Sequence, residues 1–67
     1  MNQAKAQELA VEALRITEVD DPTPVADTTV LFRNADGTWS VVDNGEEVVC
    51  DTDSEAIRII VENLTAC

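Results

Sequence analysis

The dipeptide Asn44-Gly45 restricts the possible folds of this chain most strongly, because it separates two runs of residues that favour β-structure. Asn-Gly between such runs is typical of a two-residue hairpin turn. A loop of this length fixes three cross-strand pairs: Asp43 with Glu46, Val41 with Val48, and Trp39 with Cys50. One face of the hairpin is then apolar, and we expect it to form the core with Trp39, Val41, Val48 and Cys50.

A further hairpin is predicted around residues 34–37, where Asn34-Ala35-Asp36-Gly37 suits a type I turn with the glycine at positive φ. Two registers are open here. If Arg33 pairs with Thr38, the side chains of Val30 and Phe32 join the core face.

A bulged three-residue loop would instead turn Leu31 and Arg33 inward. We expect the first register, because burial of an unpaired Arg33 is costly. In that register Leu31, Val42 and Val49 form an apolar strip on the outer face of the sheet. Such a strip is either a lightly covered sheet face or a dimer contact.

Helical patterns flank the predicted strands on both sides. Residues 3–16 place small and apolar side chains on one stripe and charged ones on the other, which indicates an amphipathic helix. Residues 53–65 repeat this pattern after Thr52, which with Glu55 matches a capping box. The small alanines of the first helix should let it approach the sheet closely.

Between the first helix and the strands, residues 17–27 form an acidic connector with two prolines and no apolar period. Strands are predicted at 28–33, 38–43 and 46–50. The sequence therefore predicts one α+β domain over residues 1–67. Its order is helix, three-stranded antiparallel meander, helix, with both helices on one face of the sheet.

Charge restricts the function. The 67 residues include 14 Asp and Glu against 4 Lys and Arg, with no His, giving a formal net charge of -10. The usual general bases and imidazole ligands are nearly absent, so we expect neither an enzyme nor a cofactor or metal site. Repulsion from phosphates disfavours direct binding to nucleic acid. The expected partner is a basic protein.

Neither a run of about 18 apolar residues nor a signal-peptide pattern is found, so we expect a soluble cytoplasmic protein without membrane contact. A reducing compartment keeps both cysteines as free thiols. Cys50 is predicted to be buried, and Cys67 to be frayed and inert.

The acids gather in the connector, at the second hairpin and before the last helix. Rigidly held carboxylates at strand and helix spacings resemble a row of phosphates in scale. We take the following residues as the partner-binding site: Asp20, Asp21, Asp43, Glu46, Glu47 and Asp51.

Simpler roles exist for several acids. Asp53 and Glu55 suit the positive end of a helix dipole, and Glu46 and Glu47 would protect a sheet edge from pairing. Residues 51–55 alternate oxygen ligands like a calcium loop, but lack its turn glycine and terminal glutamate, which excludes a metal site of that type.

In length, acidity and element order, residues 3–67 resemble the small anti-CRISPR proteins of phages and mobile elements that mimic DNA, most of all the fifth family of type I-C inhibitors. The resemblance implies action in the host bacterial cytoplasm, without catalysis. It also implies binding to the DNA-binding surface of a type I surveillance complex (Cascade), at its large PAM-reading subunit. A monomer or a weak homodimer fits this role.

Two alternatives remain at this point. An acidic structural or regulatory module of a halophile would also carry one Lys against 14 acids. An antitoxin-like inhibitor of a basic nuclease would use the same charge.

Overall fold

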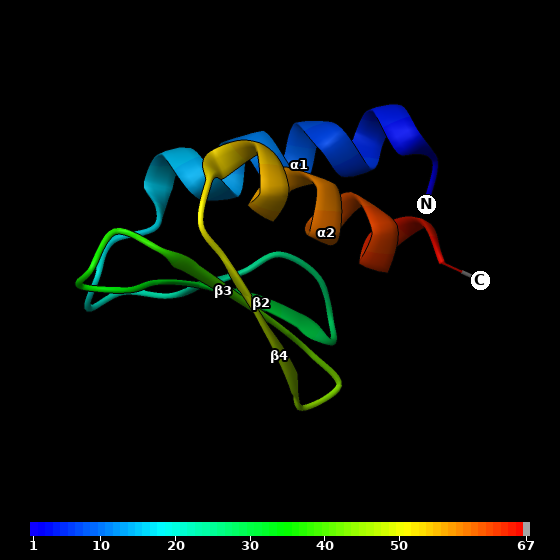
Figure 1. Ribbon diagram of the computed structural model, residues 1–67. Coiled ribbons are helices and arrows are strands. Elements are labelled where there is room, and N and C mark those ends of the chain that lie inside the picture. The colour runs from blue at the N-terminus through cyan, green and yellow to red at the C-terminus, as the bar shows by residue number, and fades with distance from the viewer. Residues whose placement is uncertain (67) are drawn as a thin grey trace.

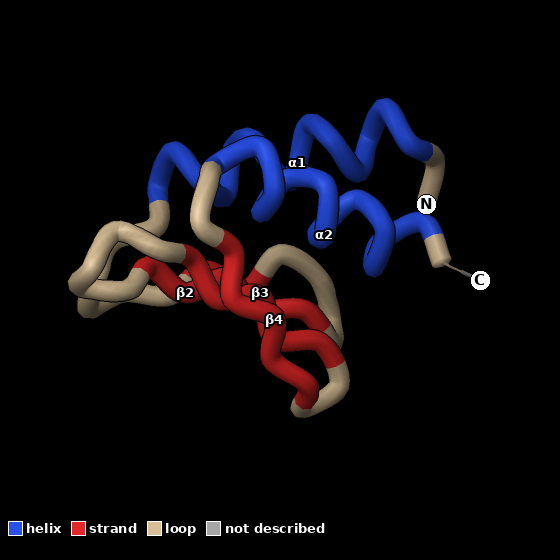
Figure 2. Tube along the Cα trace, viewed as in Figure 1, coloured by secondary structure: helices blue, strands red, loops and turns tan. Residues whose placement is uncertain are grey.

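The protein has an α+β fold in which two helices cover one face of an antiparallel sheet (Figure 1). The computed structural model describes residues 1–66. Its elements are α1 (Gln3–Ile16), β1 (Thr23–Pro24), β2 (Thr29–Arg33), β3 (Trp39–Asp43), β4 (Glu46–Cys50) and α2 (Asp53–Thr65). The four strands lie in the order β1-β2-β3-β4. The helices lie side by side and run in opposite directions, while the other face of the sheet carries no helix of the described chain (Figure 2).

Both helices have the predicted bounds, and side-chain caps explain where they begin. The Asn2 side chain accepts a hydrogen bond from the Lys5 amide at 2.8 Å. Thr52 does the same for the Glu55 amide at 3.1 Å, as predicted. The Glu55 carboxylate reaches one residue further back than in a standard capping box and accepts from the Asp51 amide at 3.2 Å.

The two helices pack against each other through small side chains. Ala6, Ala10 and Ala13 of α1 are buried, and α2 buries Ala56 and Ile60. Because alanine keeps the backbones close, α1 packs mainly on α2, and the close approach predicted toward the sheet is made to this helix instead. The main contact of α1 with the sheet is at the β1 edge. It is α2 that lies across the strands. None of the helices in the described chain is long and apolar enough to cross a membrane.

The β3–β4 hairpin has the predicted register, and its turn residues Asn44 and Gly45 both have positive φ, at 52° and 84°. Three of the four predicted core residues in this hairpin are buried: Trp39, Val41 and Cys50. The prediction for Val48 is wrong, since this side chain is 43% exposed. The β3–β4 hairpin diverges from the helices toward its tip (Figure 1), which explains why Val48 is only partly covered.

The expected β2–β3 register is also wrong. Leu31 pairs with Val41 and faces the core, whereas Val30 and Phe32 lie on the outer face. The loop is the bulged alternative: the Asn34 amide donates to the Thr38 carbonyl at 2.9 Å, which leaves three residues in the turn.

Arg33 tolerates this register because it does not need a carboxylate. Its guanidinium lies over the Trp39 ring, 4.3 Å from the centroid, and the residue keeps partial contact with water. A cation stacked on an aromatic face avoids most of the cost that we assigned to a buried charge.

The connector contains a short strand that the sequence did not predict. Thr23 of β1 pairs with Leu31, and Pro24 pairs with Val30. Proline is tolerated here because β1 is an edge strand. The hydroxyl of Thr17 donates to that of Thr23 at 2.6 Å, which ties the connector to the end of α1. β2 and β3 each begin one residue later than predicted, and Cys67 lies outside the described residues.

Candidate functional site

The net charge comes from one part of the chain. Three of the four cations form ion pairs within a helix: Lys5 with Glu8 (4.0 Å), Arg15 with Glu12 (2.6 Å), and Arg58 with Glu62 (2.9 Å). The fourth, Arg33, stacks on Trp39. Charges therefore balance on α1 and after residue 55, while residues 17–55 contain eleven acids and one cation.

Four of these eleven acids have structural partners. The partners are the Thr38 amide and hydroxyl for Asp36 (3.0 and 2.7 Å), the Thr28 and Thr29 hydroxyls for Asp43 (3.1 and 2.8 Å), the Trp39 indole N–H for Asp53 (2.8 Å), and the Asp51 amide for Glu55 (3.2 Å). The bonds from Thr38 lower the pKa of Asp36. These acids stabilise turns and the start of α2.

The other seven carboxylates form no side-chain hydrogen bond or ion pair within residues 1–66: Glu18, Asp20, Asp21, Asp27, Glu46, Glu47 and Asp51. All seven residues are exposed. We call them the free acids. They include five of the six residues predicted for the partner-binding site. The exception is Asp43, whose carboxylate bridges two threonine hydroxyls and holds β2 to β3.

Sheet register divides the free acids into two groups. β1 runs antiparallel to β2, so the residues before Thr23 lie toward the end of β2. Cys50 pairs with Trp39, which places the start of α2 at this same end of the sheet. Glu18, Asp20, Asp21 and Asp51 belong to this end, which we call the connector end (Figure 1, left side).

The second group lies at the opposite end, around the β3–β4 turn. Glu46 pairs with Asp43, and Glu47 is its neighbour on β4. The Asn44 amide donates to the Thr28 carbonyl at 3.1 Å, which brings Asp27 to this turn. We call this group, Asp27, Glu46 and Glu47, the hairpin end. The six predicted site residues therefore form two groups of three rather than one continuous patch.

Two of the free acids, Glu18 and Asp27, belong to the predicted connector but not to the predicted partner-binding site. The composition of the connector was the available signal for both. The position of Asp27 beside the β3–β4 turn depends on a backbone contact between distant segments, which no local pattern reveals.

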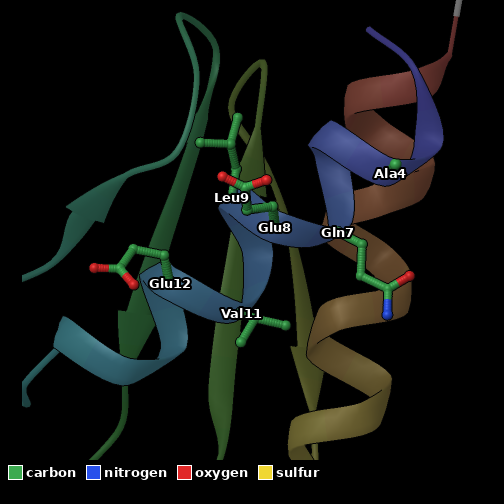
Figure 3. A pocket seen from close by; sticks show the side chains of 6 residues that line it. All are labelled: Ala4, Gln7, Glu8, Leu9, Val11 and Glu12. Carbon is green, nitrogen blue, oxygen red and sulfur yellow. The ribbon is translucent and has the colours of Figure 1, made fainter.

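One hollow of the surface is formed by α1 alone. Its six lining side chains lie on the outer side of this helix and spread around it without converging on one point (Figure 3). Within residues 1–66 no group of three His, Cys, Asp or Glu side chains is placed to hold a metal ion. Comparison of the chain with protein-family models, curated proteins and solved structures finds no match.

Proposed function

We propose that this protein is a non-catalytic inhibitor that mimics the charge of DNA and occupies the DNA-binding surface of a basic protein. The free acids carry this proposal, because seven exposed carboxylates without an internal partner add repulsion to a small domain and give it no stabilising contact. Lysines and arginines that normally hold phosphates would supply the missing counter-charges.

The grouping of the acids favours this function over adaptation to high salt. A halophilic surface uses acids for hydration and has no need to confine them. Here α1 carries two acids balanced by two cations, while all of the net charge lies within residues 17–55. Such a distribution suits recognition by an oppositely charged surface.

The resemblance described above gives the most specific target, the large PAM-reading subunit of a type I surveillance complex in the bacterial cytoplasm. The test is a competition assay with a purified type I-C complex and a fluorescent duplex that contains its PAM. We expect the protein to displace the duplex at equimolar or modest excess. Undisturbed duplex binding at large excess contradicts the proposal.

A matched pair of variants separates local charge from net charge. Glu46→Lys/Glu47→Lys reverses two free acids at the hairpin end, whereas Glu8→Lys/Glu12→Lys makes the same change in net charge on α1. We expect the first pair to weaken inhibition at least about tenfold and the second to have a much smaller effect. Equal loss in both would show that only total charge matters.

A further inference from the structure

The outer face of the sheet exposes apolar side chains that the described chain leaves uncovered. In one cross-strand row, Phe32 lies beside Ser40 and Ser40 beside Val49; Phe32 is 37% and Val49 56% exposed. The neighbouring row contains half-buried Val30 and Val42. Both helices lie on the opposite face (Figure 2). This chain has 1 Phe and 1 Trp, and the Phe is on the open side.

The buried polar side chain at the centre of this face has a hydrogen-bond partner. Ser40 is only 3% exposed, and its hydroxyl accepts a hydrogen bond from the Asn34 side-chain amide at 2.9 Å. The same amide group donates to the Thr38 hydroxyl at 2.9 Å. Ser40 is therefore already removed from water and bonded to Asn34, so covering the centre of the face adds little desolvation cost at this residue.

The charges around the outer face determine what kind of molecule can bind there. Glu47 follows Val42 in its cross-strand row, so a free acid borders the apolar residues. Arg33, the only cation of the strands, is turned to the other face by its contact with Trp39. An apolar centre bordered by the Glu47 carboxylate, with free acids at both ends of the sheet, is complementary to an apolar surface surrounded by Lys and Arg.

A second copy of this chain fits less well. Stacking two outer faces would bring together two molecules of net charge -10 and place Glu47 of each copy in the contact region. Repulsion of this kind opposes association. The same charges favour a basic partner.

We propose that the outer face of β2, β3 and β4 is the docking surface for the basic partner, with Phe32 and Val49 as its apolar contacts. This inference rests on the proposed function, and it extends it. The free acids at both ends of the sheet attract and orient the partner, while the apolar centre excludes water and slows dissociation.

The test compares two neighbours on β4 that point to opposite faces. Val49→Arg places a long cation on the outer face, and Val48→Arg makes the same charge change on the helix-side face, where the side chain is 43% exposed. Binding of each variant to an immobilised type I-C surveillance complex gives Kd. Thermal unfolding by circular dichroism checks that both variants fold.

We expect Val49→Arg to raise Kd at least about tenfold, and Val48→Arg to stay within about threefold of wild type. Phe32→Thr, which changes no charge, should also raise Kd, and it decides the matter if Val49→Arg does not fold. Equal effects at positions 48 and 49, together with unchanged binding by Phe32→Thr, overturn the docking surface and leave the proposed function intact. Absence of binding by the wild-type protein overturns both.

Discussion

The Arg33 guanidinium, at the connector end of the sheet, packs against a buried aromatic side chain. It lies 4.3 Å from the centroid of the Trp39 ring, and the Trp39 indole N–H donates to Asp53 at 2.8 Å. One aromatic side chain therefore connects a strand, a cation and the first residue of α2. This arrangement predicts that Arg33 contributes to stability through Trp39 and not through a carboxylate.

Arg33→Met keeps an apolar stem and removes the cation. We expect the free energy of unfolding to fall by about 0.5–1 kcal/mol and the native fluorescence of Trp39 to shift. Arg58→Met is the matched control, because Arg58 pairs with exposed Glu62 on α2 and should contribute only about 0.3–0.5 kcal/mol. An unchanged native spectrum in Arg33→Met would contradict the stacked geometry.

Cys50 gives a prediction for alkaline pH. Burial raises the pKa of its thiol, and the negative charge of Glu55 raises it further. A thiol with a raised native pKa stabilises the fold while protonated, and this contribution disappears as the pH rises from the unfolded-state pKa toward the native one. In a Cys67→Ser background, unfolding free energy should fall above about pH 8.5.

Few other side chains titrate in this alkaline range, because the sequence contains no Tyr and a single Lys. Cys50→Ala in the same background should lack the alkaline fall, although the loss of the buried sulfur lowers its stability at every pH. If the unfolding free energy depends on pH in the same way in both proteins, the pKa of Cys50 is the same in the native and unfolded states, which contradicts this prediction.

At the level of elements, turn chemistry determines which side chains face the helices. Gly37 has φ of 92° and closes the three-residue loop between β2 and β3. An added Cβ there would meet no atom within 4 Å, so substitution tests the backbone conformation alone.

We expect Gly37→Ala to lower the free energy of unfolding by about 1 kcal/mol or more. The mirror-image residue D-alanine, introduced by chemical synthesis, prefers positive φ and should be neutral or stabilising. Urea denaturation followed by Trp39 fluorescence measures both. Equal losses for L- and D-alanine would contradict the turn geometry.

Local patterns were sufficient for the elements that local contacts determine. The bounds of both helices follow from caps and periodicity, and Asn44-Gly45 fixed the register of β3 against β4. The β2–β3 register depends on whether the inner face can accommodate Arg33. It can, because the Trp39 ring on the neighbouring strand stacks with the guanidinium, and no local pattern reveals this contact. Strand β1 forms two backbone pairs with β2 although its own sequence, Thr-Pro, has no strand pattern.

For the whole molecule, the confined charge predicts a salt-dependent stability. The Debye length shortens from about 30 Å at 0.01 M salt to about 8 Å at 0.15 M, so added NaCl screens repulsion among the free acids. We expect cooperative folding in dilute buffer, with a Tm that rises on addition of NaCl. Thermal unfolding followed by circular dichroism at both salt concentrations measures this change in Tm. A chain that folds only in molar salt would support the halophilic alternative.

The candidate site was predictable in composition and not in arrangement. Five of the six residues chosen from the sequence have free carboxylates, because acids outside caps and tight turns seldom have internal roles. The division between two sheet ends, and the replacement of Leu31 by Val30 and Phe32 on the outer face, required the register of the sheet.

The salt dependence of partner binding tests the central claim most directly. Kd for a type I-C surveillance complex should be measured between about 50 and 200 mM NaCl, for wild type and for Glu46→Lys/Glu47→Lys. If the free acids replace phosphates, the wild-type Kd rises at least about tenfold over this range, and the variant shows a weaker dependence. A wild-type Kd that changes less than about twofold, or equal dependence in both proteins, would contradict charge mimicry.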